Sequence, residues 1–205
     1  TAIKGSIDLL DIAPEEKKKQ LLEMLKRNTE RLVLLINDLL DMDKIISGNI
    51  NFNYQDYPIK DLIPQIIDDN QGYAREQSTR IVLKGDLPAG IIHVDKTRFN
   101  QIMANLISNA CKFTADGTDV EINVTEKNHV IVFNVTDHGA GIPESFQSRL
   151  FERFTQTDST TTRAVGGTGL GLYITRQLVE AMHGEITFES QLEVGTTFSV
   201  SFKAM

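Results

Sequence analysis

Five polar side chains suited to chemistry lie on one face of a helix predicted for residues 96–113. Their spacing of three or four residues stacks them in one line: Arg98, Gln101, Asn105, Asn109 and Lys112. Asparagine is unfavourable inside a helix, so two of them one turn apart suggest a purpose other than folding. Asn carbonyls bind Mg²⁺ and a lysine neutralises phosphate oxygens, which predicts a phosphate and cation site. A solvated polar face is the alternative interpretation.

A carboxylate and a run of glycines form two further candidate segments. Asp137 follows the strand predicted for residues 129–136, where a carboxylate accepts hydrogen bonds from an exocyclic amine. Gly139 and Gly141 let the backbone approach a flat ring closely. Residues 166–172, Gly-Gly-Thr-Gly-Leu-Gly-Leu, lead into a predicted helix and would expose backbone N–H groups to an anion. Each segment taken alone also fits an ordinary turn.

The glycine-rich segment does not fit the familiar nucleotide motifs. No Gly-Lys-Ser or Gly-Lys-Thr follows it, which excludes a Walker A loop, and Leu172 stands where the dinucleotide fingerprint requires its third glycine. Ala2-Ile3-Lys4 imitates the lysine motif of protein kinases, but the chain contains neither His-Arg-Asp nor Asp-Phe-Gly.

The clearest helical pattern covers residues 14–47. Its seam follows heptad spacing: Leu25, Asn28, Leu32, Leu35, Leu39, Met42 and Ile46. Residues 1–12 look like the end of a preceding helix. Two antiparallel helices cannot bury so wide a stripe, so we expect a four-helix bundle made by two copies of the chain.

The pattern changes after Ser47-Gly48-Asn49, which is a helix stop signal. Strands are predicted at residues 50–57, 80–84, 91–94, 119–126, 129–136, 185–190 and 196–203. Helices are predicted at residues 59–76, 96–113 and 168–182. Helices interspersed with mostly antiparallel strands predict an α+β fold class, with an α/β sandwich of one helical layer on one mixed sheet. Residues 137–167 show little periodicity, and a long irregular segment in a compact domain is usually functional.

Composition limits the partners of this chain. It has 205 residues, of which 40% are hydrophobic, and a net charge of −7, which argues against binding nucleic acid or an anionic membrane. The single cysteine fits a reducing compartment, and no apolar run is long enough for a membrane span. We therefore expect a cytoplasmic protein without direct membrane contact. The chain starts at Thr1 rather than Met, which suggests a piece of a longer protein whose upstream region can be anchored in the inner membrane.

Taken in order, these segments resemble the histidine protein kinases of bacterial two-component signalling, a branch of the GHKL ATPase superfamily. Residues 105–114 resemble the N box, and residues 137–141 resemble the G1 box. Residues 151–154, Phe-Glu-Arg-Phe, resemble the F box, and residues 166–172 resemble the G2 box. Residues 193–198 are similar to the last glycine box, with Glu193 where many members have glycine.

The resemblance implies a role for individual residues. Asp137 would accept from the adenine amino group, Asn109 would hold Mg²⁺ between the phosphates, and residues 155–166 would form a lid over the triphosphate. Asn105, Lys112 and Arg153 would be the catalytic residues, the first beside the γ-phosphate and the other two neutralising charge. The implied nucleotide-binding set is Asn105, Asn109, Lys112, Phe113, Asp137, Gly139, Gly141, Ile142, Phe154, Gly166, Gly167, Thr168, Gly169, Leu170, Gly171 and Thr196.

The resemblance also implies domains and partners. Residues 1–47 are similar to part of a dimerisation and histidine-phosphotransfer domain, residues 48–50 would be a linker, and residues 51–205 would be the ATP-binding catalytic domain. The motif that carries the phosphoacceptor would precede Thr1, because none of the chain's own histidines is a good substitute. The implied partners are a second copy, bound through residues 1–47, and the receiver domain of a response regulator.

Two other functions remain open at this stage. The first is a GHKL nucleotide-binding module that dimerises without transferring phosphate, although the intact N box argues against it. The second is an ATPase of the gyrase kind, which needs a glutamate on this helix to activate water. No Glu occurs between Asp95 and Thr114, so transfer to a protein acceptor is favoured over hydrolysis.

Overall fold

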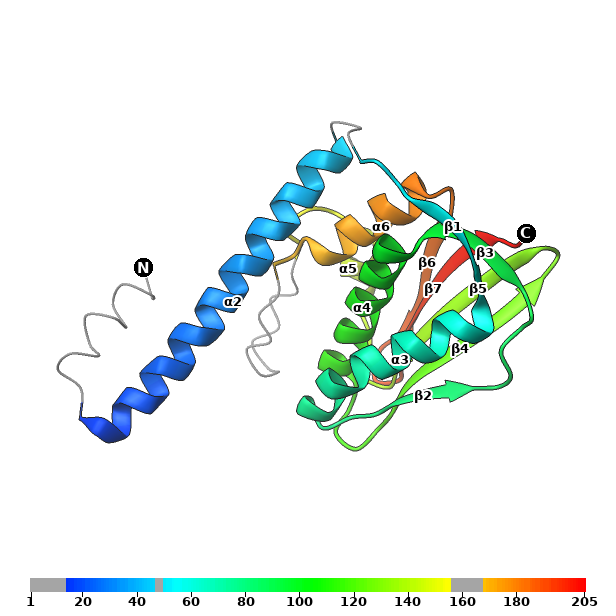
Figure 1. The fold of residues 1–205 in the computed structure, drawn as a ribbon. Coiled ribbons are helices and arrows are strands. Elements are labelled where there is room, and N and C mark those ends of the chain that lie inside the picture. Colours follow the sequence, from blue (N-terminus) through cyan, green and yellow to red (C-terminus); the bar gives the residue numbers. More distant parts are fainter. Residues whose placement is uncertain (1–13, 47–49, 156–167) are drawn as a thin grey trace. The chain divides into compact units, whose positions relative to one another are not determined.

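A computed structural model describes residues 14–46, 50–155 and 168–205 of the chain (Figure 1). The chain divides into two compact units, residues 1–49 and residues 50–205. The helix expected over residues 1–12 lies outside the described residues. Each unit is described by itself below.

The described part of the first unit is one long helix, α2 (Glu15–Ile46). The Pro14 carbonyl accepts hydrogen bonds from the backbone N–H groups of Lys17 and Lys18, which closes the first turn. Among the side chains of this helix that the structure describes, seven large apolar ones are exposed within the chain: Leu22, Met24, Leu32, Val33, Ile36, Leu39 and Leu40. The predicted helix over residues 14–47 is confirmed to within a residue at each end. In the described part of the chain, no helix is long and apolar enough to cross a membrane.

The second unit is built on a five-stranded sheet in the order β2-β4-β5-β7-β6. Its strands are β2 (Ile81–Lys84), β4 (Val120–Lys127), β5 (Val130–Asp137), β6 (Glu185–Gln191) and β7 (Gly195–Lys203). Only β2 and β4 run parallel, while the other neighbours are antiparallel. The predicted α+β class with a mixed sheet is confirmed.

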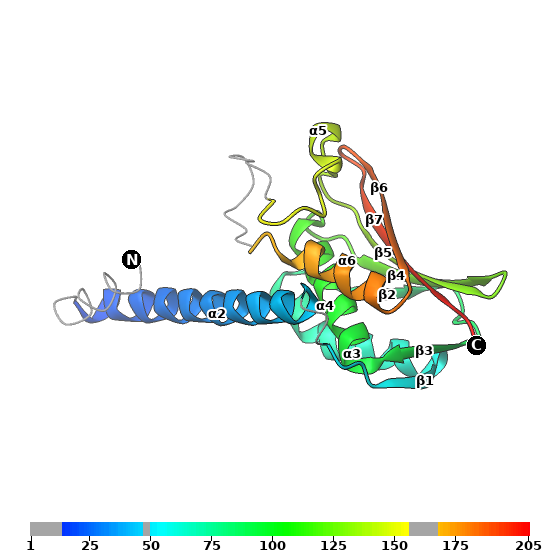
Figure 2. The same ribbon diagram turned by 90° about the horizontal axis from the view of Figure 1, so that it is seen from above.

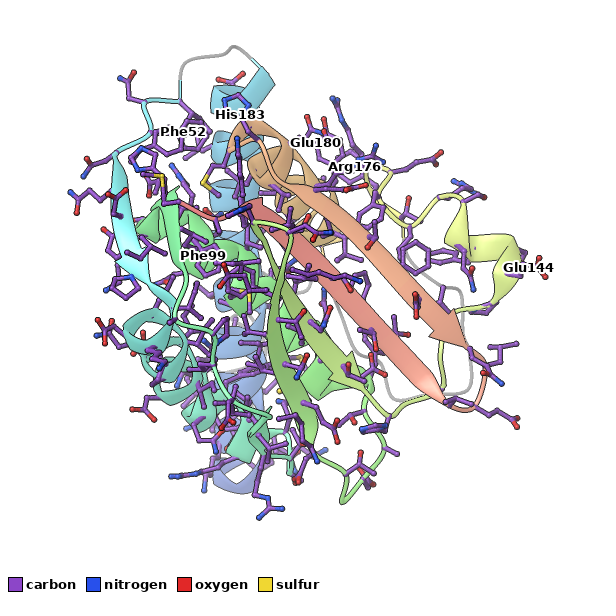
Figure 3. The ribbon with its side chains drawn as sticks, turned by 90° about the vertical axis from the view of Figure 1, so that its right-hand side faces the viewer. Phe52, Phe99, Glu144, Arg176, Glu180 and His183 are labelled. Carbon is purple, nitrogen blue, oxygen red and sulfur yellow. The ribbon has the colours of Figure 1, made fainter. Side chains whose placement is uncertain are left out.

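Three helices cover one face of this sheet (Figure 2). They are α3 (Ile59–Glu76), α4 (Lys96–Phe113) and α6 (Gly171–Ala181). The core between the layers holds three fully or nearly buried rings, with Phe99 lying 5.0 Å from Phe133 and 5.8 Å from Phe202 between centroids (Figure 3). Strands β5 and β7 alternate buried and half-exposed positions, as expected for a sheet with one covered face.

The expectation of a single sheet is wrong. β1 (Tyr54–Pro58) and β3 (Ile91–Asp95) pair with each other in a separate two-stranded antiparallel sheet. The Asp95 carboxylate ends β3, accepts the Arg98 N–H as the N-cap of α4 and also accepts the Asn53 N–H. The ribbon is therefore tied to the start of α4, and it meets the large sheet through the isolated bridge between Ile92 and Ala204.

Two further predictions for the second unit need correction. The helix predicted from residue 168 begins at Gly171, because Gly169 has a φ of +71° that no α-helix contains. Residues 137–167 are also not wholly irregular, since Pro143 leads into the short helix α5 (Glu144–Gln147). Residues 156–167 of that segment lie outside the described residues.

Candidate functional site

The polar face of α4 meets the first turn of α6. Asn105, Asn109 and Lys112 are all half-buried on α4. The Asn105 side-chain amide donates to the Thr175 hydroxyl at 2.8 Å, and a Cβ placed on Gly171 would lie 2.5 Å from Asn105 Oδ1. The structure thus brings together Asn105 of the N-box segment and Gly171 of the glycine-rich segment.

Lys112 combines partial burial with a positive charge. Burial lowers the pKa of its ammonium group below the usual value for lysine, and the neighbouring Cys111 only partly opposes that shift. An anion bound beside Lys112 would favour the charged form and reverse the shift. The electrostatics therefore suit a phosphate at this end of α4.

Asp137 ends β5 and is 5% exposed. Its Oδ1 atom accepts the Gly139 N–H at 3.0 Å, and Thr196 lies opposite it in the pairing of β5 with β7. Burial raises the pKa of the Asp137 carboxyl, while hydrogen bonds from the Gly139 and Thr196 backbones and the charge of His138 act against the rise. A buried carboxylate with acceptor capacity is suited to an amine-bearing ligand.

The two glycines after Asp137 are required by close backbone packing. A Cβ on Gly139 would lie 1.8 Å from the Phe113 carbonyl oxygen, and one on Gly141 would lie 2.2 Å from the Gln191 carbonyl oxygen. Gly141 also has a φ of +69°, which disfavours other residues. The segment after β5 is thereby held against the end of α4 and the β6–β7 hairpin, which places Phe113, itself 54% exposed, near Asp137.

The described ends of the F-box and glycine-rich segments also meet. Gly169 packs on the backbone of Phe154, whose side chain is exposed. Leu170 is fully buried, and its N–H donates to the Thr168 hydroxyl. Ile142 is half-buried beside the β6–β7 hairpin. Gly166 and Gly167 lie outside the described residues.

Comparison with known families shows which family the chain belongs to. The model described as histidine kinase-, DNA gyrase B- and HSP90-like ATPase matches residues 94–205, and the model described as His Kinase A (phospho-acceptor) domain matches residues 1–48. The chain belongs to the histidine kinases of this ATPase family. The resemblance found in the sequence is therefore confirmed.

Three curated relatives illustrate the similarity of this histidine kinase chain. It is 36% identical over 187 residues to the circadian input-output histidine kinase CikA of Synechococcus elongatus, covering 90% of this chain and 25% of that protein. It is 37% identical over 193 residues to the autoinducer 2 sensor kinase/phosphatase LuxQ of Vibrio vulnificus, covering 91% of this chain and 22% of that protein. It is 36% identical over 184 residues to the signal transduction histidine-protein kinase BarA of Escherichia coli, covering 86% of this chain and 20% of that protein. The chain thus spans a quarter or less of these relatives.

Solved structures share the fold. Full-length ShkA in complex with AMPPNP is 27% identical, with a TM-score of 0.77 over 99% of this chain and 42% of that chain. The histidine kinase AdeS of Acinetobacter baumannii is 19% identical, with a TM-score of 0.75 over 98% of this chain and 92% of that chain, and it supports the fold alone.

Arg153 of this histidine kinase contacts α6. Its guanidinium donates to the Tyr173 hydroxyl at 2.8 Å and lies 4.8 Å above the centre of the Tyr173 ring. A cation over an aromatic ring is attracted by the electron-rich face of the ring. The predicted contact of Arg153 with phosphate stays a prediction.

Sequence reasoning missed three polar residues that organise the site: Tyr173, Thr175 and Ser190. Tyr173 holds Arg153, Thr175 holds Asn105, and Ser190 on β6 contacts the segment after β5. Tyr173 and Thr175 lie just inside α6, close enough to the glycine-rich segment to be suspected. Ser190 carries no local signal, because its contacts come from distant segments.

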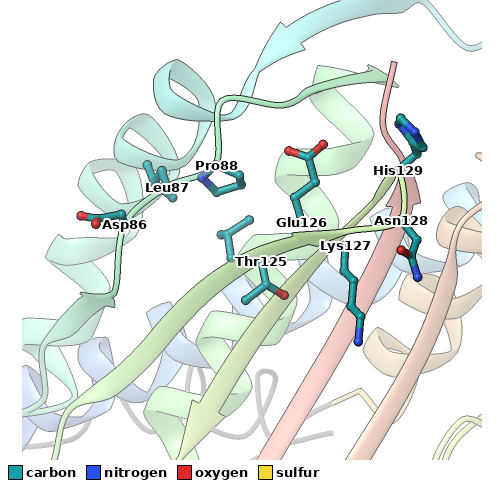
Figure 4. Close-up of a pocket in the computed structure, with 9 residues that line it drawn as sticks. Asp86, Leu87, Pro88, Thr125, Glu126, Lys127, Asn128 and His129 are labelled. Carbon is teal, nitrogen blue, oxygen red and sulfur yellow. The ribbon is translucent and has the colours of Figure 1, made fainter.

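An open groove of about 720 Å³ lies apart from these residues, between the β2–β3 connection and the β4–β5 hairpin (Figure 4). It is lined by Asp86, Leu87, Pro88, Val124, Thr125, Glu126, Lys127, Asn128 and His129. None of the residues predicted for nucleotide binding lines this β4 edge groove, so we do not assign it to the kinase site.

Proposed function

We propose that the chain is the catalytic core of an ATP-dependent protein histidine kinase. The observation that carries the proposal is the buried Asp137 carboxylate, held by Gly139 and Thr196 beside the end of a helix that presents Asn105, Asn109 and Lys112. The relatives named above are histidine kinases, and the similar ShkA structure contains AMPPNP, an ATP analogue, which supports ATP as the ligand. A module without transfer activity is not favoured by these comparisons.

Several segments of the chain would take part in ATP recognition. Asp137 accepts a hydrogen bond from the adenine amine, and Gly141, Ile142 and Thr196 lie beside the base. Lys112 neutralises phosphate oxygens. Burial lowers the pKa of its ammonium group, and contact with the phosphate raises that pKa again. The glycine-rich segment, from Gly166 to Gly171, supplies backbone N–H groups to the phosphates. The exposed side chains of Phe113 and Phe154 lie at the margins of the proposed ATP site.

Mg²⁺ fits this donor set only as an ion shared with the nucleotide. No group of three or more His, Cys, Asp or Glu side chains within the described residues could hold a metal ion by itself. The amide oxygen of Asn109 would therefore be the protein's ligand, as is usual for Mg²⁺ bound mainly by phosphates and water. When bound, the ion supplies charge neutralisation to the triphosphate.

Transfer requires an acceptor imidazole in line with the γ-phosphorus. As the bond from the imidazole nitrogen to phosphorus forms, the bond to the β–γ bridging oxygen breaks and the electron pair leaves with ADP. Asn105 lies where α4 meets α6, and Lys112 and Arg153 provide positive charge. The absence of Glu between Asp95 and Thr114 removes the obvious base for hydrolysis.

The acceptor is proposed to lie in the full protein before Thr1. His93 lies 2.6 Å from the Asp56 carboxylate, His138 lies 3.3 Å from that of Glu121, and His129 and His183 occupy turns with positive φ. We further propose a homodimer through residues 1–47, a response-regulator receiver domain as the next acceptor, and a cytoplasmic location for this part of the protein.

The proposal is tested by phosphate transfer between separate molecules. The chain is incubated with Mg²⁺ and radiolabelled ATP, alone and with a separate helical-hairpin domain that carries an acceptor histidine. We expect acid-labile phosphate on the added domain and none on the chain itself. Asn109→Asp should abolish transfer, whereas Asn134→Asp, the same change on the uncovered face of the sheet, should not. Stable phosphate on one of the chain's own histidines would contradict the acceptor assignment, and failure to bind ATP would contradict the function.

A further inference from the structure

The turn formed by residues 151–154 is fixed beside α6 at both of its ends. Phe151 is half-buried, and the guanidinium of Arg176 on α6 lies 5.6 Å from the centre of its ring. At the other end, a Cβ on Gly169 would lie 2.8 Å from the carbonyl carbon of Phe154. The turn is therefore held next to the glycine-rich segment and the start of α6.

Within this turn, Arg153 keeps an uncompensated positive charge. The neighbouring carboxylate of Glu152 pairs with Arg149 at 3.0 Å. Arg153 instead donates to the Tyr173 hydroxyl at 2.8 Å, with its guanidinium 4.8 Å from the centre of the ring. It forms no ion pair with any residue that the structure describes. Since a phenol is neutral, the charge of Arg153 is available to an anion.

Tyr173 restricts the guanidinium without using up its hydrogen-bond donors. The side chain of Arg153 is exposed and has many rotamers, so a second contact is needed to keep it in one place. Stacking over the ring uses none of the five N–H groups of a guanidinium, and the bond to the hydroxyl uses one. Four N–H groups thus remain for phosphate oxygens.

The position of Tyr173 determines where these donors are held. Tyr173 lies in the first turn of α6, and a helical side chain covers the turn that precedes its own Cα. The Tyr173 hydroxyl is therefore carried towards the glycine-rich end of the helix, the end at which the proposed function puts the phosphates.

We propose that Tyr173 is a positioning residue that holds Arg153 ready for the phosphate that is transferred. A guanidinium that is already ordered in the free protein loses less conformational entropy when it binds an anion, so its contact with phosphate is tighter. This inference rests on the proposed nucleotide site, and it adds the residue that prepares one of the positive charges of that site.

The experiment measures the affinities of AMPPNP and ADP by calorimetry at constant Mg²⁺, because only AMPPNP carries the third phosphate. Tyr173→Phe removes the hydrogen bond and keeps the ring, and it should weaken AMPPNP binding about three- to fivefold. Tyr173→Leu removes both contacts and should weaken AMPPNP binding about tenfold. The affinity for ADP should change by less than about twofold in both variants.

A double-mutant cycle with Arg153→Gln separates positioning from general damage. Arg153→Gln alone should weaken AMPPNP binding about tenfold. Adding Tyr173→Phe should then have no further effect, because the charge that Tyr173 positions is gone.

Tyr57→Phe is the matched control. Tyr57 has the same two kinds of contact, since its hydroxyl donates to Gln55 at 3.0 Å and the Lys96 ammonium lies 5.7 Å from the centre of its ring. It lies on β1, in the separate two-stranded sheet, and none of the residues proposed for nucleotide binding is among these partners. Tyr57→Phe should leave both affinities unchanged.

Three results would overturn the inference while the proposed function stands. Unchanged or tighter AMPPNP binding by Tyr173→Phe would show that Tyr173 does not prepare Arg153 for phosphate. An equal loss of affinity for AMPPNP and ADP would show a purely structural residue. A full effect of Tyr173→Phe in the Arg153→Gln background would show that Tyr173 acts through another group. A folded wild type that binds neither nucleotide would instead contradict the proposed function itself.

Discussion

Asp137 is a residue whose burial works against stability. The pKa of its carboxyl is raised above 3.8, chiefly by burial, so folding disfavours the ionised form. This loss of folding stability is present at pH values above the raised pKa. It is relieved as the pH falls through the raised pKa towards the pKa of the same carboxyl in the unfolded chain. Such a cost is typical of a group kept for binding.

Asp137→Asn should therefore separate stability from binding. At neutral pH the variant should be as stable as the wild type or more stable, because it removes a buried charge, and the difference should close on acidification. ADP affinity should fall by about 1–3 kcal/mol, because the amide mispairs with the adenine amine. Thermal denaturation from about pH 4 to about pH 8, with calorimetry of ADP binding, measures both. A clear loss of stability at neutral pH would show that the carboxylate is a structural group.

Cys111 provides a second prediction at the scale of a residue. It is 3% exposed, and burial raises the pKa of its thiol to about 11. Since the thiolate is the reactive species, modification by a disulfide reagent near pH 8 should be at least about a hundredfold slower in the folded protein than in denaturant. Rapid modification of the folded chain, followed by absorbance, would contradict the burial of this thiol.

Two glycines test how the elements are joined. Gly139→Ala would drive a Cβ into the Phe113 carbonyl, so we expect it to lower the free energy of unfolding by about 1–3 kcal/mol or more. Gly72→Ala is the matched control, because a Cβ there, within α3, meets nothing within 4 Å. It should raise the free energy of unfolding by about 0.5–1 kcal/mol. Urea denaturation measures both variants, and equal effects would show that Gly139 is not required for close packing.

The helices could be predicted well where one face is buried. Residues 59–76 and 96–113 are helices with the predicted bounds, because positions such as Phe99, Ile102 and Leu106 repeat with the helical period and are fully buried. The separate β1–β3 sheet could not be predicted. The alternation of apolar and polar residues in β3 indicates a strand, but it does not indicate which other strand pairs with it. The contacts of Arg153 with Tyr173 and of Ser190 with Ile142 were missed for the same reason, because they join segments that local spacing does not relate.

At the scale of the whole molecule, α2 determines the expected oligomeric state. Its exposed apolar side chains include Leu32 and Leu39, each more than 40% exposed in the single chain. Replacing both by Asp should shift a dimer to monomer, because burying each leucine contributes about 1.5–3 kcal/mol. Sedimentation measures the shift, and ADP affinity should not change. Gln20→Asp, on an exposed polar position of the same helix, is the control. A double variant that remains dimeric would place the interface elsewhere.

The β4 edge groove has a consequence for the behaviour of the protein at high concentration. β5 pairs with Glu121–Lys127 of β4, whereas β2 covers only Val120–Asn123, so within the described residues Val124–Lys127 form an open sheet edge. An open edge invites strand addition by another chain, and charged side chains and proline oppose it. Glu126 and Lys127 lie on this edge and Pro88 lines the groove facing it. Resistance to aggregation in this domain thus depends on side chains that take no part in phosphate transfer.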